Sequence, residues 1–106
     1  MKNKIGIDIV DFKEVIGIIK ELKKKIPNKG IYLFGSILNK TAIRYESDAD
    51  ILIIPKNNEN FNQLYSLAWN ATKKLLDKGI APHIIIYNQQ SHSSLLKEIK
   101  KKGRAI

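Results

Sequence analysis

Cysteine is absent from the 106 residues of the chain, which also contain a single methionine and a single tryptophan. The absence of cysteine excludes disulfide bridges, zinc sites built from thiolates and cysteine nucleophiles. It also fits the cytoplasm, where we expect the protein because the sequence shows neither a signal peptide nor a membrane-spanning run.

Long apolar runs are missing as well. No stretch approaches the roughly 20 apolar residues of a membrane-spanning helix, so we expect no membrane association. At the N-terminus, Asp8, Asp11 and Glu14 interrupt the continuous apolar core that a signal peptide would need. The sequence contains no internal repeat or low-complexity linker, and its length suits one hydrophobic core, so residues 1–106 are predicted to form a single domain.

Acidic residues are scarce relative to basic ones. The chain has 10 Asp and Glu against 19 Lys and Arg, which gives a formal net charge of +9 at pH 7. Such an excess attracts polyanions and anionic ligands. Much of it lies in two lysine clusters, at residues 20–25 and 97–104, which could be solvated helix faces or contact surfaces for RNA, a nucleotide or an acidic protein.

The spacing of apolar residues predicts alternating helices and strands. Amphipathic helices are predicted over residues 11–26 and 61–76, the second ending near Gly79. Strand-like runs occur at residues 31–34, 49–55 and 81–88, and a last helix capped by a serine is expected over residues 91–103. Two closely joined strands and a third reached through a helix predict an α/β fold, a small mixed β-sheet with helices packed on one face.

A pair of carboxylates opens the second strand, in the sequence SDADILII. Residues two apart in a strand project to the same side, so Asp48 and Asp50 should point together. Adjacent carboxylates repel each other unless a cation lies between them, and Mg²⁺ commonly takes one or two carboxylates together with substrate phosphates. The pair is therefore a candidate metal site, although a purely structural turn into a buried strand would need no metal.

A second polar element follows the first predicted strand. Gly35 permits close approach of the backbone to a ligand, and Ser36 offers a hydroxyl and an N–H to phosphate oxygens. Either element alone is common. A Gly-Ser pair after a strand, followed about a dozen residues later by Asp-x-Asp at the start of the next strand, predicts one site for phosphate and divalent metal.

This order of motifs resembles the signature of the DNA polymerase beta-like nucleotidyltransferase superfamily. The short length and the C-terminal sequence LLKEIKKKGRAI are similar to its small stand-alone members, the minimal nucleotidyltransferases. The resemblance covers nearly the whole chain. It implies a polymerase beta-like nucleotidyltransferase fold, ATP or another nucleoside triphosphate as substrate, Mg²⁺ or Mn²⁺ as cofactor, and transfer of a nucleotidyl group, commonly AMP, to a protein or RNA acceptor. Minimal members are often paired with a HEPN-family toxin, against which they act as the antitoxin.

Carried over by position, the resemblance assigns roles to the two motifs. It implies that Asp48 and Asp50 are catalytic and bind the metal. The residues implied to hold the triphosphate or shape its surroundings are Gly35, Ser36, Ser47 and Lys40. Ser47 would support the turn before the carboxylates. Lys40 stands in the segment GSILNK, where the family usually has an arginine and a glycine, and is the candidate replacement cation.

The third carboxylate of active family members has no counterpart in the third predicted strand, where His83 stands instead. Its strand position predicts that it lies beside the aspartates. A histidine can act as a general base and can bind Mn²⁺, but it is a poor ligand for Mg²⁺. His83 could therefore replace the carboxylate, pair with the aspartates in a site without catalysis, or be a surface residue at a strand end.

Three functions compete at this stage. The protein could be an enzyme that transfers a nucleotidyl group, or a weak or inactive relative that neutralises its partner by forming a complex. It could also be a basic nucleic-acid-binding domain with structural aspartates, although the intact Asp-x-Asp argues against this. A homo-oligomer is also possible.

Overall fold

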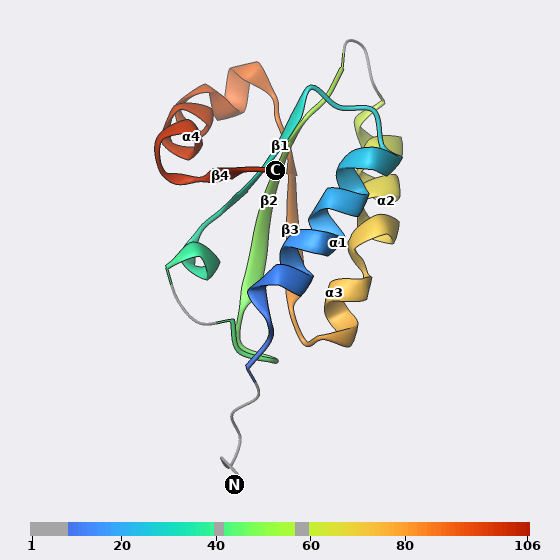
Figure 1. Ribbon diagram of the computed structural model, residues 1–106. Coiled ribbons are helices and arrows are strands. Elements are labelled where there is room, and N and C mark those ends of the chain that lie inside the picture. Colours follow the sequence, from blue (N-terminus) through green and yellow to red (C-terminus); the bar gives the residue numbers. More distant parts are fainter. Residues whose placement is uncertain (1–8, 40–41, 57–59) are drawn as a thin grey trace, which may run out of the picture.

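A four-stranded mixed β-sheet forms the centre of the molecule, with helices on both faces (Figure 1). The structure is a computed structural model that describes residues 9–39, 42–56 and 60–106. The helices are α1 (Phe12–Lys25), α2 (Phe61–Thr72), α3 (Lys74–Asp77) and α4 (Gln89–Lys102), with a 3₁₀ turn, η1, at Ser36–Leu38. The strands are β1 (Gly30–Phe34), β2 (Asp48–Ile54), β3 (Ala81–Ile86) and β4 (Arg104–Ala105).

The strands lie in the order β3, β2, β1, β4 across the sheet. β1 pairs with both β2 and β4 in antiparallel fashion, whereas β2 and β3 are parallel because α2 and α3 connect them. The predicted α/β class and small mixed sheet are confirmed. The sequence did not predict β4.

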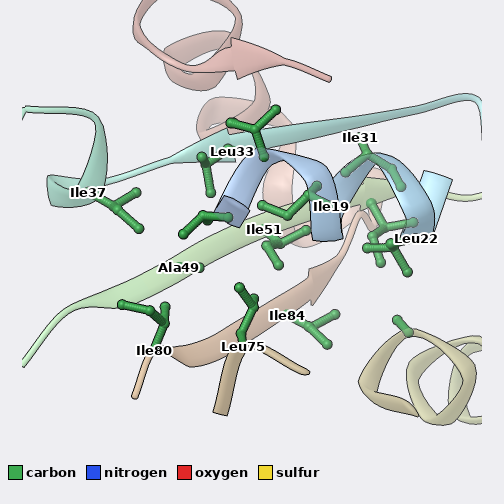
Figure 2. Packing of buried hydrophobic residues seen from close by; sticks show 14 of the residues in the cluster. Ile19, Leu22, Ile31, Leu33, Ile37, Ala49, Ile51, Leu75, Ile80 and Ile84 are labelled. Carbon is green, nitrogen blue, oxygen red and sulfur yellow. The ribbon is translucent and has the colours of Figure 1, made fainter. Parts of the chain in front are cut away.

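The main core lies between the sheet and the helices α1, α2 and α3 (Figure 2). Alternation along β2 directs Ala49, Ile51 and Ile53 into this core, where all three side chains are fully buried. From α1, the buried residues Val15, Ile16, Ile19 and Leu22 follow the predicted helical spacing. The lysines in the last turn of α1 are exposed, and Lys23 Nζ donates to the Ile106 carbonyl.

The opposite face of the sheet is covered in part by α4 (Figure 1). Leu52 of β2 and Ile99 of α4 are both buried, and neither belongs to the main core cluster. Helices α1 to α3 pack on one face as predicted, and α4 adds a layer on the other. This layer shares its face of β2 with Asp48 and Asp50, because residues of even number point away from the main core.

The predicted helix over residues 61–76 is divided at Lys73 into α2 and α3. The buried Thr72 hydroxyl donates to the Ala68 carbonyl at 2.8 Å, and such hydrogen bonds back onto the helix bend it. After α3, Gly79 adopts a positive φ of 74° and ends the helix. The N–H of Gly79 donates to Leu76 and that of Ile80 to Leu75, which closes the helix as the sequence predicts.

The last helix begins at Gln89, two residues before the predicted start, and its cap is Asn88 rather than a serine. The Asn88 side chain accepts from the N–H of Gln90 at 2.9 Å, and the Asn88 N–H donates to His92 Nδ1 at 2.9 Å. This reciprocal pair resembles a capping box and explains the earlier start. None of the described helices has the length and apolarity to cross a bilayer.

The Asn88 cap should make a measurable contribution to the free energy of unfolding. We expect Asn88→Ala to lower the free energy of unfolding by about 1 kcal/mol, since an N-cap side chain satisfies backbone donors of the first turn. Urea unfolding followed by circular dichroism would measure it. Ser94→Ala, at an exposed position inside the same helix, should cause no loss; equal losses in both variants would contradict the capping role.

Candidate active site

The backbone of Gly35 lies directly against the carboxylate of Asp50. Gly35 follows β1 with a φ of 88°, a conformation that L side chains rarely adopt. A Cβ built on Gly35 would overlap the Asp50 side chain, meeting Oδ2 first and lying 3.1 Å from Cγ. The strand register explains the contact, because Phe34, the last residue of β1, is paired with Asp50. The two sequence motifs therefore meet in one place.

Asp48 and Asp50 project from the same face of β2, as the spacing predicts. Asp48 is exposed at the first position of the strand, opposite Ala81 of β3. Asp50 lies further in, between Phe34 of β1 and His83 of β3, and its side chain is 26% exposed. The intervening Ala49 is fully buried on the other face, so the backbone fixes the direction of both carboxylates.

His83 lies beside Asp50, with Nδ1 of the imidazole 3.0 Å from Oδ1 of the carboxylate. The histidine side chain is 66% exposed, so most of the ring faces solvent. The contact forms an ion pair when the ring is protonated and a hydrogen bond from Nδ1–H when it is neutral. The contact and the exposure fit replacement of the carboxylate, pairing with the aspartates and a surface position alike, so all three interpretations stay open.

The serines predicted for the site lie in different surroundings. Ser36 is exposed at the first position of η1, and no hydrogen bond within the described residues involves its hydroxyl. The Ser47 hydroxyl accepts from the Ile43 N–H at 2.8 Å, and the Ser47 N–H donates to the Ile43 carbonyl at 2.9 Å. Ser47 thus closes the loop before β2. Lys40 lies outside the described residues.

A family model described as "Nucleotidyltransferase domain" matches residues 15–106. The chain belongs to this family. The resemblance drawn from Gly-Ser and Asp-x-Asp is thereby confirmed at the level of the family.

The fold of this nucleotidyltransferase domain is similar to that of a chain in "Crystal structure the toxin-antitoxin MntA-HepT". The two share 24% sequence identity with a TM-score of 0.52, and the match covers 90% of this chain and 70% of that chain. No curated protein sequence matches significantly. The structural likeness confirms the predicted fold.

The two aspartates of the nucleotidyltransferase domain could supply some, but not all, of the ligands of a divalent metal ion. Asp48 and Asp50 provide oxygen ligands on one face, and the described residues contain no group of three or more His, Cys, Asp or Glu placed to hold a metal. Mg²⁺ is often bound by one or two carboxylates with water and substrate phosphates as the other ligands. The two aspartates correspond to such a set.

A groove of about 200 Å³ adjoins Gly35 on the side of α4. Its apolar lining comes from Phe34 and Leu38 on one side and Leu95 and Ile99 of α4 on the other, while Glu98 and Lys102 contribute charged groups. Sequence reasoning missed this groove. The signal was the alternation in β1, which directs Ile31 and Leu33 into the main core and therefore Phe34 to the opposite face.

Proposed function

We propose that the protein is a metal-dependent nucleotidyltransferase that moves AMP from ATP to a protein or RNA acceptor, and that it is the antitoxin of a HEPN-family partner. The observation that carries the proposal is the close approach of Gly35 to the Asp50 carboxylate. A backbone turn suited to phosphate oxygens and a carboxylate suited to a metal would thereby act on one nucleotide. Membership of the family supports the same chemistry.

In this proposal each residue has a distinct task. Asp48 and Asp50 would hold Mg²⁺ or Mn²⁺, which when bound stabilises the charge that develops on the transferred phosphoryl group. The turn at Gly35 and the exposed Ser36 hydroxyl would orient the triphosphate. Ser47 would keep the loop before the aspartates closed through its hydrogen bonds to Ile43.

His83 would accept the proton of the acceptor hydroxyl as that oxygen bonds to the α-phosphorus of ATP and pyrophosphate leaves. A neutral imidazole that donates Nδ1–H to Asp50 Oδ1 leaves Nε2 unprotonated, and Nε2 can then act as a general base. The high exposure of the ring gives an acceptor access to it. The Asp50 carboxylate would fix the tautomer as well as bind the metal.

The similarity in fold to a chain of the MntA-HepT complex supports the proposed antitoxin role. The exposed lysines at the end of α4 would provide an RNA or acidic-protein contact. The cytoplasmic location stays a prediction from the sequence.

A second candidate function is a binding module that neutralises its partner without catalysis. The pairing of Asp50 with His83 favours it, because a protonated imidazole would offset the carboxylate charge in place of a metal. In this case the complex alone would inhibit the partner. Metal and ATP would then be dispensable for neutralisation.

Transfer of label separates the two functions. The purified protein would be incubated with ATP labelled on the α-phosphate, with Mg²⁺ or Mn²⁺, and with either the protein encoded by the neighbouring gene or cellular RNA. Metal-dependent label on an acceptor is the expected result and would identify its class. A stable complex with the neighbouring protein, without label under either metal, would favour the binding module.

Substitution of His83 tests the general-base role. We expect His83→Ala to lower the rate of transfer by about 100-fold, because positioned general bases typically contribute factors of 10²–10⁴. The affinity for ATP, measured by calorimetry with metal present, should change little. His92→Ala is the matched control, since His92 contacts Asn88 at the start of α4 and should leave transfer unchanged. Full activity in His83→Ala would contradict the role.

A further inference from the structure

Helix α2 presents an aromatic stripe to solvent. Phe61, Tyr65 and Trp69 follow one another four residues apart and are 42%, 48% and 37% exposed. Helix α2 has no charged residue, although 27% of the chain is charged. Exposed aromatics on an uncharged helix have the composition of an interface core, and the first charge along the stripe is the exposed Lys73 at the end of the helix, four residues beyond Trp69. The sequence predicts helical spacing for these residues, and in the structure each of the three leaves more than a third of its surface exposed.

The stripe lies on the side of α2 that is remote from α1. Ala71 lines the groove between α2 and α1, and Leu64 and Ala68 are buried beneath the helix. At 3.6 residues per turn, Tyr65 is about 120° around the helix from Ala71, with the buried residues between them. Since α2 contacts β3, the stripe borders the outer side of that strand.

β3 is an edge strand whose outer side has no partner within the described part of the chain. The Ala81 N–H donates to the carbonyl of Ser47, just before β2, and the Tyr87 N–H donates to the carbonyl of Ile53 in β2. Because a parallel ladder uses alternate residues, positions 82, 84 and 86 direct their backbone groups outward. Pro82 has no N–H to lose, as expected at an edge, but Ile84 and Ile86 present a donor and an acceptor each.

We propose that a second copy of this chain docks on this surface, with β3 pairing antiparallel to β3 of the partner and the two aromatic stripes packing together. A two-fold axis perpendicular to the sheet would extend it from four strands to eight. The same axis would place both α2 helices side by side on one face. The two-fold rotation would thus give hydrogen-bond partners to the outward backbone N–H and C=O groups of Ile84 and Ile86. It would also cover the aromatic stripe.

The distribution of charge favours a second copy despite the net charge of +9. The lysine-rich ends of α1 and α4 belong to helices outside the proposed contact, which is formed by the uncharged α2 and by β3. A different protein would need its own strand edge and apolar helix in matching positions, whereas a second copy supplies both by symmetry. The surface also differs from the carboxylate face of the sheet, so the proposal does not depend on nucleotidyl transfer.

Sedimentation equilibrium of the wild-type protein and a variant tests the proposal. We expect the wild type to reach twice the 12.1 kDa mass of one chain, with dissociation in the micromolar range, about 1–10 µM. Tyr65→Lys should raise the dimer dissociation constant at least about 100-fold, because a charge would be buried at the centre of the contact. The single tryptophan, Trp69, reports the same event, and its emission should shift to shorter wavelength as the wild-type concentration rises.

The matched control is Leu67→Lys, which introduces the same charge at an exposed apolar position on another side of α2, where Leu67 is 44% exposed. This variant should dimerise like the wild type. A wild type that stays monomeric throughout would overturn the proposal, as would a dimer that persists in Tyr65→Lys or dissociates equally in Leu67→Lys. A wild type that stays monomeric and whose Trp69 emission shifts only when a different protein is added would show that the surface binds that protein instead of a second copy.

Discussion

Asp50→Asn should lower nucleotidyl transfer by about a thousandfold or more while leaving the protein folded. Asparagine keeps the shape of the side chain and can still accept a hydrogen bond from His83, but it removes the negative charge that would hold the metal. Asp50 is also the point at which β1, β2 and β3 meet in the site, since it is paired with Phe34 and His83. Its charge is thus the feature on which the proposed reaction depends most.

The measurement should separate metal binding from stability. Mn²⁺ binding, followed by the paramagnetic resonance of the free ion, should weaken in Asp50→Asn, and thermal unfolding should stay close to that of the wild type. Asp77→Asn is a control that removes the same charge from an exposed residue of α3. Transfer at the wild-type rate in Asp50→Asn would exclude metal-assisted catalysis at this position. Absence of transfer in every variant, wild type included, would leave the binding module.

Gly35→Ala should both destabilise the protein and abolish productive nucleotide binding. Alanine at this position would have to keep the φ of 88°, which is unfavourable for an L residue. Its methyl group would also overlap the Asp50 carboxylate. Strain of this kind costs about 1–3 kcal/mol, so we expect the free energy of unfolding to fall by about that amount. Displacement of Asp50 or of the turn would separate the two halves of the site, and transfer should fall by about 100-fold or more because misplacement of this size is costly.

Gly17→Ala is a control in which the free energy of unfolding should rise instead of fall. Gly17 lies inside α1, and a Cβ at this position would meet nothing within 4 Å. Alanine is favoured over glycine in a helix, so this variant should be more stable than the wild type by about 0.5–1 kcal/mol. Chemical unfolding of both variants would show the contrast. If Gly35→Ala matched the wild type in stability and in ATP affinity, the approach of Gly35 to Asp50 could not be essential.

The fold was predictable wherever periodic burial decides structure. Helix α1 and strand β2 could be predicted from the spacing of their apolar residues, because each directs one set of side chains into the main core. α2 ends at Thr72, whose hydroxyl donates to the Ala68 carbonyl, and such a hydrogen bond has no distinct pattern in sequence. β4 consists of only two residues, so it has no period to recognise. Which face of the sheet α4 covers depends on the path of the chain after β3, which local spacing does not specify.

The candidate site was predictable in its residues more than in its contacts. The common direction of Asp48 and Asp50 follows from strand geometry alone. Their relation to Gly35 and His83 depends instead on register, since a shift of one residue would turn the partners to the other face. Register is set by how the strands pack against the helices, so the approach of Gly35 to Asp50 became visible only in the folded structure.

The position of Asp50 on a central strand has a consequence for local unfolding. β2 has hydrogen-bonded neighbours on both sides and buried side chains on both faces, Ile51 toward the main core and Leu52 toward α4. Its amide protons should therefore exchange with solvent only when the whole domain opens. The exposed turn at Gly35 and Ser36 lacks such support and should open in small, local fluctuations. The carboxylates would thus keep their place at the full stability of the domain while the turn rearranges around an arriving nucleotide.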